Sequence, residues 1–413
     1  MSNNKDIIAL FNYGGGMRGL IPAHFMAKIE DVTGLRMVDM VDIFTGPSTG
    51  AILNAALNVP HPDHPDRPKY RARHMVKFYE REGLNIFPQD RFREFRALIH
   101  DFNNRTMKIN QLNALFKKGH YDPAHLGHSL SALFGDTKLS DSLQSLIIPV
   151  YNIDGEQLEV VEEAGETGET PVHTQNNFAD RGGHAVWLKN MKMELRKRPA
   201  PDVSLFDAIQ ASTAAPTYFP CHHFQVKYND ERNTHEYSGI DGSIFDNPCI
   251  SYHGAIRQHI PEGRNLKMIM LGTGHTLRSI KKEDWNNYGG LGVVDPVNDL
   301  PLINILFHAS ETALMESFGE EMGKNLYVFN KSMVLDINNL NTPNTQIDDA
   351  SPENLARLKV FFEEMLEDNK KQFDDVCHLL VSNRDRKEDD KREQGTSLGK
   401  ILRHYISRGE KRA

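Results

Sequence analysis

The chain contains 413 residues with a formal net charge of −8, so it lacks the excess of basic residues that a general nucleic-acid-binding protein needs. This length exceeds what one hydrophobic core usually holds, which predicts one large domain with an appendage or two domains. The three cysteines follow no metal-ligand spacing, so we expect neither a disulfide framework nor a metal site. Such sparse cysteine usage also predicts that the protein is found in a reducing compartment.

The first sixty residues alternate between apolar strands and helical patterns. Residues 6–12 (DIIALFN) predict a strand, and residues 20–34 predict a helix that ends at Gly34. Residues 38–44 predict a second strand, and residues 50–59 a second helix after a sharp turn. Strands that alternate with helices indicate an α/β fold with a parallel sheet covered on both faces.

A glycine cluster separates the first strand from the first helix. Gly14, Gly16 and Gly19 fit the pattern G-x-G-x-x-G, which in this position is typical of a dinucleotide-binding loop, with Asp39 offered to the ribose. Glycines also allow backbone N–H groups to converge on the oxyanion of an acyl-transfer reaction. The glycine pattern by itself leaves both interpretations open.

The turn after the second strand contains G-x-S-x-G, with Ser48 between Gly46 and Gly50. A strand–turn–helix with this pattern is typical of a nucleophile elbow, in which the flanking glycines permit a tight turn that exposes the serine hydroxyl. The helix N-terminus behind Ser48 also favours negative charge at this position. We therefore predict that Ser48 is a nucleophile.

Two kinds of base are available to Ser48. Asp241, followed by Gly242 at the end of a predicted strand, can deprotonate a serine directly if it is ionised and within hydrogen-bond reach. A Ser-His-Asp triad would instead need a histidine after the acid in chain order. The candidates for that role are His253, His259, His275 and His308.

The middle of the chain supplies a candidate lid and further strands. Residues 61–130 are a candidate lid or insert. Within them, residues 90–104 (DRFREFRALIHDFNN) have apolar residues near helical spacing. They predict either a lid or membrane-surface helix or, as we favour, a helix packed on the core. Residues 144–154 and 265–274 predict buried strands that run into glycine-containing turns.

The character of the sequence changes near its C-terminus. Residues 336–350 predict a linker, and Ser351 with Pro352 predicts the first turn of a helix. Residues 351–413 therefore form a predicted helical C-terminal region. Its basic end, residues 395–413, indicates either contact with anionic lipid or a packed terminal helix.

Four ordered motifs resemble those of the patatin-like phospholipases. They are GGGMRG (14–19), GPSTG (46–50), DAIQASTAAPTYFP (207–220) and DG (241–242). The segments IIPVYNIDGE (147–156) and IMLGTG (269–274) are similar to interior strands of that family, so the resemblance covers roughly residues 6–280. It implies a three-layer α/β/α sandwich with a mostly parallel central sheet, and substrates that are lipid acyl esters.

The resemblance also implies a role for each motif. Ser48 would be the nucleophile and Asp241 the base of a Ser–Asp dyad, with Gly46 and Gly50 in the elbow and Gly242 and Ser243 as neighbours of the acid. The oxyanion hole and substrate-binding loop would consist of Gly14, Gly15, Gly16, Met17, Arg18 and Gly19, with Arg18 fixing the loop.

We therefore predict a phospholipase A-type lipid acyl hydrolase domain over residues 6–335, with its core motifs in residues 14–243. The alternatives are an α/β-hydrolase esterase with a triad and a dinucleotide-binding module. We expect no cofactor and no nucleic-acid partner; expected partners are a phospholipid or other lipid ester, a protein or small-molecule activator, and a second copy of the chain.

The sequence also predicts a location. The first strand begins almost at the N-terminus, so we expect no signal peptide, and no apolar run approaches the roughly 18 residues that span a bilayer. We therefore expect a cytoplasmic protein with peripheral contact to membranes.

Overall fold

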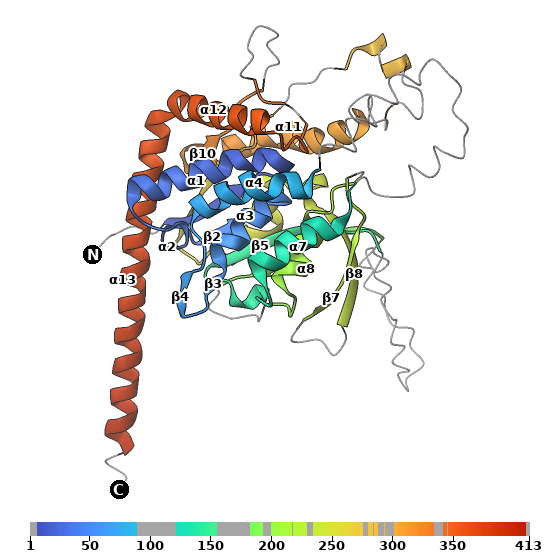
Figure 1. Ribbon diagram of the computed structural model, residues 1–413. Helices are drawn as coiled ribbons and strands as arrows, with labels where there is room; N and C mark the ends of the chain where they lie inside the picture. The colour runs from blue at the N-terminus through green and yellow to red at the C-terminus, as the bar shows by residue number, and fades with distance from the viewer. Residues whose placement is uncertain are drawn as a thin grey trace, which may run out of the picture.

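The computed structural model describes residues 6–88, 121–154, 182–192, 200–216, 218–228, 234–275, 280–283, 285–287, 293, 301–333, 342–344 and 346–409. Their main feature is a central β-sheet between layers of helices (Figure 1). Among the described residues this sheet has eight strands in the order β10-β9-β1-β2-β5-β8-β7, with β6 also paired to β5.

One half of the sheet is parallel and the other half is antiparallel. The parallel strands are β1 (Asp6–Asn12), β2 (Ile43–Thr45), β5 (Ser145–Asn152), β9 (Asn265–Leu271) and β10 (Leu326–Phe329). The strands β6 (His184–Asn190) and β8 (Thr234–Asp241) run antiparallel to β5, and β7 (His222–Lys227) runs antiparallel to β8. The predicted α/β class is confirmed, with a sheet that is more mixed than the alternation of the first sixty residues indicates.

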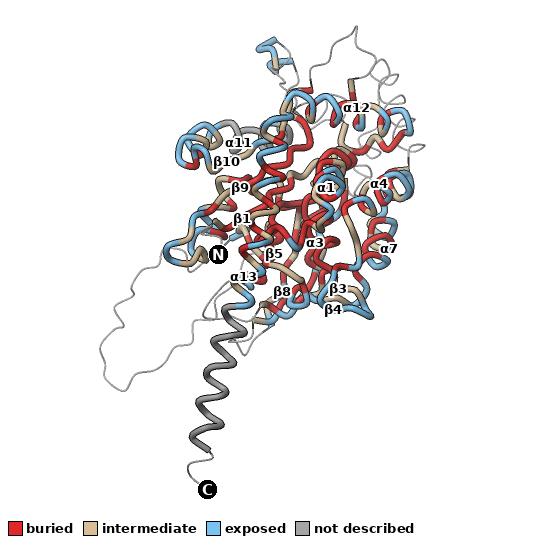
Figure 2. Tube along the Cα trace, turned by 90° about the vertical axis from the view of Figure 1, so that its left-hand side faces the viewer, coloured by how far each residue is buried: buried red, intermediate tan, exposed pale blue. Residues whose placement is uncertain are grey.

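Side chains of β1 alternate between two cores, as a strand buried on both faces requires. Ile8 and Leu10 belong to a core covered by α1 (Leu20–Thr33), α3 (Thr49–Asn58) and α8 (Leu205–Ser212). Ile7, Ala9 and Phe11 belong to a second core, closed by α9 (Pro248–Ser251) and α11 (Pro301–Met322). Figure 2 shows the buried segments running through the middle of the molecule with exposed ones outside. The two cores, one on each face of β1 and each covered by helices, give the predicted three-layer arrangement.

The structure tests the predicted elements of the first sixty residues. The helix over residues 20–34 is confirmed as α1, and Gly34 ends it in the left-handed conformation (φ 70°) that favours glycine. The predicted strand 38–44 is wrong in its first half, because Met37–Met40 form a short helix, α2. Lys387 donates to the carbonyl oxygens of Val38 and Val41 (3.0 and 2.7 Å), a contact with the C-terminal region that no local pattern announces.

The segment after the elbow forms a hairpin and two helices. The hairpin pairs β3 (Pro60–His61) with β4 (His64–Pro68), and the helices are α4 (Ala72–Ile86) and α7 (Pro123–Phe134). The predicted amphipathic segment 90–104 lies outside the described residues. The region predicted as a lid or insert thus contributes α4 and α7 to the helical layer around α3, which they both flank in Figure 1.

The C-terminal region packs against the sandwich. Ser351 caps α12 (Pro352–Asp368) as predicted, since its hydroxyl accepts the Asn354 N–H (3.2 Å). Phe362 of α12 meets Phe25 of α1 edge to face, with ring centroids 4.9 Å apart. The chain then turns into α13 (Lys370–Gly409), which passes the sandwich and projects beyond it in Figure 1.

Candidate active site

Ser48 occupies a strained turn between β2 and α3. Its φ of 55° and ψ of −128° lie in a region that residues with a side chain rarely adopt, and among the described residues it is the sole non-glycine with a positive φ. Such strain is worth about 1–3 kcal/mol and occurs mainly at functional positions. The backbone is held by Ser212, whose hydroxyl accepts the Ser48 N–H (3.2 Å) and donates to the Pro149 carbonyl (2.7 Å).

The two glycines of the elbow are required by β1. A Cβ atom at either Gly46 or Gly50 would lie 2.0 Å from the carbonyl oxygen of Asn12, and Gly46 also has a φ of 137°. Asn12 is itself fixed, because its amide donates to Asn54 of α3 (2.7 Å). The elbow therefore sits directly on the end of β1, next to the glycine loop.

Asp241 reaches Ser48 through the register of the sheet. Thr45 of β2 pairs with Ile147 of β5, and Val150 of β5 pairs with Asp241 of β8. Val150 lies three positions after Ile147, as Ser48 lies three positions after Thr45, so Asp241 ends at the same edge of the sheet as Ser48. The Ser48 hydroxyl lies near enough to the Asp241 carboxylate to lower its pKa. The structure therefore brings the two predicted dyad residues together.

The neighbours of Asp241 hold its backbone and carboxylate. Its N–H donates to the Ala214 carbonyl (3.0 Å), and its Oδ1 accepts the Ser243 N–H (2.8 Å). Gly242 is required here, because a Cβ atom would lie 2.4 Å from the carbonyl oxygen of Pro149. Burial raises the pKa of Asp241 to about 6, although the hydrogen bond from the Ser243 N–H and the nearby Ser48 hydroxyl oppose the rise. At neutral pH the carboxylate is thus mostly ionised and able to accept a proton.

The glycine loop, residues 14–19, lies against Ser48. A Cβ atom at Gly14 would be 3.0 Å from the Cβ of Ser48, and the Gly14 carbonyl accepts the Thr273 hydroxyl (2.8 Å). Gly15 and Gly16 have φ values of 155° and 56°, which favour glycine. Their N–H groups have no acceptor among the described residues.

The remaining residues of the loop are tied down or packed. The Met17 N–H donates to the Ile347 carbonyl (2.7 Å), and the Arg18 N–H donates to the Gly15 carbonyl (3.1 Å). A Cβ atom at Gly19 would lie 2.2 Å from the Thr49 hydroxyl oxygen. Of the six residues predicted for this loop, Gly15 and Gly16 thus present the backbone donors that suit an oxyanion.

An apolar pocket opens beside the dyad. The space that the centre of a water-sized probe can reach inside it is about 50 Å³, so the pocket is narrow. Aliphatic and aromatic residues dominate its lining, which also includes Gly16 and Ser48. The lining consists of Gly16, Met17, Ser48, Thr49, Ile52, Phe78, Tyr79, Gly83, Ile86, Phe87, Leu126, Thr213, Ala215, Tyr218, Phe219 and Ile347.

The histidines of the triad alternative have other described contacts. His253 is 3.0 Å from Glu321, and His259 is 3.0 Å from Lys189. His275 bonds through its backbone to Lys331 and Met333, and the side chain of His308 lies outside the described residues. The titratable side chain near the Ser48 hydroxyl is that of Asp241.

The dinucleotide alternative requires an acid near the glycine loop. That loop follows the C-terminal end of β1, and the ribose-binding acid of such a site lies at the same edge of the sheet. Asp39 instead lies in α2, before the start of β2, at the opposite edge. The geometry therefore separates the two groups that this alternative needs together.

Sequence reasoning missed three residues that support the site. Ser212 holds the elbow and Thr273 holds the glycine loop; both lie in segments, ASTAAP and IMLGTG, that the resemblance had singled out. Ile347 accepts the Met17 N–H and lines the pocket, and it falls in the predicted linker, where no motif marks it.

Comparison with known proteins agrees with this geometry. The family model described as patatin-like phospholipase matches residues 13–252. The chain is 27% identical over 326 residues to patatin-like protein 2 of Arabidopsis thaliana, covering 74% of this chain and 67% of that protein. It is 28% identical over 263 residues to patatin-like protein 2 of Oryza sativa subsp. indica, with 62% and 54% covered. With Patatin-11 of Solanum tuberosum the identity is 23% over 372 residues, covering 85% of this chain and 81% of that protein.

These alignments span about half of the rice relative and about four fifths of the potato one. The matched residues include the glycine loop, the serine elbow and Asp241, which confirms the resemblance drawn from the motifs. The chain belongs to the patatin-like phospholipase family.

Proposed function

We propose that the chain is a lipid acyl hydrolase that works through a Ser48 acyl-enzyme. The observation that carries the proposal is the position of a buried, mostly ionised Asp241 beside the hydroxyl of Ser48, a residue that also lines an apolar pocket. A carboxylate in this position can act as the general base without a histidine. The strained elbow holds Ser48 in the lining of the pocket.

The reaction would proceed in two steps, formation of the acyl-enzyme and its hydrolysis. Asp241 takes the proton of Ser48 as its Oγ bonds to the ester carbonyl carbon, and the carbonyl electron pair moves to oxygen. The Gly15 and Gly16 N–H groups receive this oxyanion; removal of one such donor typically costs about 3–4 kcal/mol. The alcohol then leaves with the proton from Asp241, and water hydrolyses the acyl-enzyme by the same steps with Asp241 again as base.

The pocket supports a fatty acyl chain as the group that is transferred. Its wall is built from side chains such as Phe78, Ile86 and Phe219, which offer dispersion contacts and no buried charge. The ester carbonyl would lie at Ser48, and the leaving alcohol would face the open mouth. A phospholipid or another lipid ester fits this arrangement, with cleavage of the phospholipase A type.

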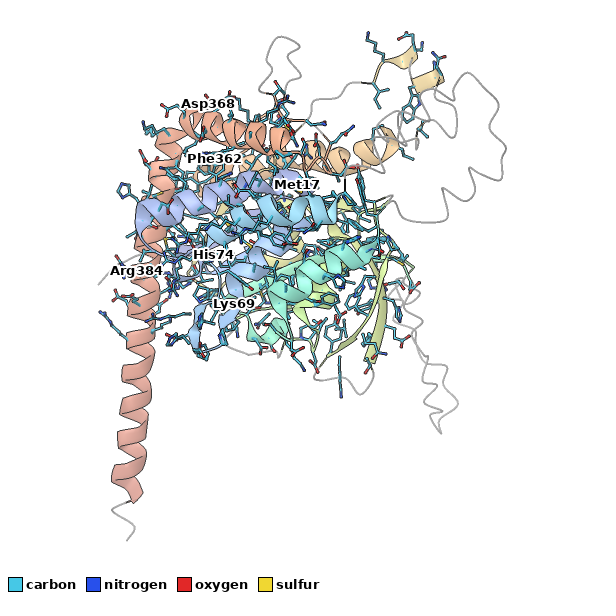
Figure 3. All side chains as sticks on the ribbon, in the orientation of Figure 1. Met17, Lys69, His74, Phe362, Asp368 and Arg384 are labelled. Carbon is cyan, nitrogen blue, oxygen red and sulfur yellow. The ribbon has the colours of Figure 1, made fainter. Side chains whose placement is uncertain are left out.

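The outer face of α4 supports docking on anionic lipid. Arg73, Lys77 and Arg81 are exposed along it and Lys69 is exposed just before its start, while Phe78, Tyr79, Gly83 and Ile86 of the helix line the pocket. Burial and the neighbouring cations, Arg73 first, lower the pKa of His74. Figure 3 shows Lys69 and His74 close together at the start of this helix. No helix in the described part of the chain is long and apolar enough to cross a bilayer.

Hydrolysis by the purified full chain tests the proposal. Release of fatty acid from mixed phospholipid vesicles is measured for the parent, Ser48→Ala and Asp241→Asn, with Asp207→Asn as a control carboxylate that pairs with His222 away from the pocket. If only the parent and Asp207→Asn release fatty acid, the result supports the dyad. Full activity of either dyad variant refutes it. Activity that appears only with added cell extract identifies the activator predicted from the sequence.

Vesicle composition tests the docking face. Activity on vesicles with phosphatidylglycerol should exceed activity on neutral phosphatidylcholine vesicles, and 0.5 M salt should remove the difference because it screens exposed charges. A Lys77→Glu, Arg81→Glu variant should lose the preference while it retains hydrolysis of a small water-dissolved ester. Equal rates on both vesicles would exclude an electrostatic docking face.

A further inference from the structure

A short segment directly before α12 crosses the glycine loop. We call residues 346–350 the strap. The carbonyl of Ile347 accepts the Met17 N–H (2.7 Å), and a Cβ atom at Gly16 would lie only 2.1 Å from that same oxygen. Figure 3 shows Met17 between α12 and α4, at the end of the sandwich that the strap covers. Ile347 is also among the residues that line the pocket, and its Cβ would lie 2.9 Å from a Cβ atom built at Gly16, another lining residue.

The strap is anchored at its α12 end. The Asp349 carbonyl accepts the Asn354 side-chain amide (2.7 Å), and Asp349 Oδ1 accepts the Ser351 N–H (3.0 Å). Asn354 is buried, and its Oδ1 accepts the Asn344 N–H (2.8 Å). The N-terminal cap of α12 and the strap therefore form one hydrogen-bonded unit.

A second anchor joins the strap to the wall of the pocket. Asp348 is only 8% exposed, and its Oδ2 accepts the Tyr121 hydroxyl (2.8 Å). The Tyr121 ring meets Phe87 edge to face at 5.2 Å and lies 5.9 Å from Phe219, and both phenylalanines line the pocket. Displacement of the strap would thus disturb the glycine loop and the pocket wall together.

We propose that Ile347 is a positioning residue for the oxyanion loop and sets the acyl-chain preference of the pocket; this inference rests on the proposed function. The carbonyl fixes the peptide plane between Gly16 and Met17, and that plane orients the adjoining donors. Oxyanion stabilisation depends on donors that are in place before the reaction. The branched side chain at the same residue limits the space for the acyl chain.

Tyr121→Phe tests the positioning role because it releases Asp348 without altering the loop or the pocket lining. Tyr70→Phe is the matched control: its hydroxyl donates to the Leu133 carbonyl (3.0 Å), and Tyr70 does not line the pocket. For a short-chain ester, we expect kcat of Tyr121→Phe to fall roughly 10-fold with little change in KM, a fraction of the effect of losing a whole donor. Phosphonylation of Ser48 by a fluorophosphonate should slow equally, because it also builds an oxyanion.

Ile347→Ala tests the specificity role. It should raise kcat/KM for long or branched acyl esters relative to short ones by about 10-fold, within the range for small changes in an apolar pocket. Ile347→Val should restore most of the parent preference. Thermal unfolding of each variant separates these effects from loss of fold.

The outcomes distinguish the two proposals. If the parent turns over esters while Tyr121→Phe matches it in kcat and phosphonylation and Ile347→Ala keeps its preference, the strap inference is wrong and the proposed function stands. If the parent turns over no lipid ester but Ser48 is phosphonylated, the proposed substrate is wrong and the labelling rates still decide the positioning role. A parent that does neither overturns both.

Discussion

Asp241→Asn should stabilise the folded protein while it removes activity. The substitution keeps the shape of the side chain and an oxygen for the Ser243 N–H, but it removes a carboxylate that is only 2% exposed. Burial raises the pKa of Asp241 from its usual 3.8 to about 6. The folded state therefore holds its proton more tightly than the unfolded state, and the free energy of unfolding decreases as the pH rises from about 4 to about 6.

The magnitude follows from the size of the shift. At 1.36 kcal/mol per pKa unit, ionisation of Asp241 destabilises the fold by about 3 kcal/mol above pH 7. Asp241→Asn removes this penalty, so it should raise the free energy of unfolding by up to about 3 kcal/mol at pH 8 and by about half as much at pH 5. Activity should fall by about 10²- to 10⁴-fold, as for loss of a general base.

Urea unfolding followed by tryptophan fluorescence at both pH values measures the effect. Asp207→Asn is the control with the opposite sign, because the hydrogen bond from His222 lowers the pKa of Asp207 and its neutralisation should destabilise the fold at neutral pH. The parent's kcat/KM should also fall as the pH drops through about 6, as Asp241 becomes protonated. A destabilised Asp241→Asn, or a gain independent of pH, would refute the reasoning.

Three further predictions concern backbone strain and a buried ion pair. Ser48→Gly should be more stable than Ser48→Ala by about 1–2 kcal/mol in urea unfolding, because glycine tolerates the φ of 55°; equal stability would argue against strain. Gly16→Ala should destabilise the protein more than Gly34→Ala and reduce Ser48 phosphonylation, since both have a positive φ but the Gly34 site is open; similar unfolding midpoints would contradict the Ile347 contact. Arg386→Met should lower the free energy of unfolding by about 3–5 kcal/mol, because it strands the buried Asp42 carboxylate; a loss under about 1 kcal/mol would show that Asp42 finds another partner.

The local parts of the site were predictable from the sequence because their chemistry is local. A strand, a tight glycine turn and a helix occupy consecutive residues at Ser48, so the pattern itself carries the geometry of the elbow. The same holds for the end of α1 at Gly34 and for the Ser351 cap of α12. In each case one or two residues fix a backbone conformation that their neighbours alone could not adopt.

The supporting contacts were not predictable because they join distant residues. Ser212 is 164 residues from the Ser48 it holds, and Thr273 is 259 residues from Gly14. A serine at the end of a helix, or a threonine between two glycines, carries no sign of its partner until the sheet register is known. The wrong half of the predicted second strand has the same origin, since Lys387 reaches Val41 from 346 residues away.

The C-terminal region shows that a highly charged composition does not mean that a segment is separate from the folded domain. The run NRDRKEDDKRE in α13 has the charge pattern of a solvated helix, yet Arg386 within it is buried and donates to Asp42, 344 residues away, while Asn383 donates to the other oxygen of that carboxylate. A run of charged residues predicts that a segment is exposed on average. It cannot reveal that one residue of the run forms a buried ion pair. Because Asp42 also accepts the Ile8 N–H at the start of β1, this helix is attached to a central strand of the sheet. The same region carries Ile347 to the glycine loop, so a chain cut at residue 340 would lose a buried ion pair and a support of that loop together.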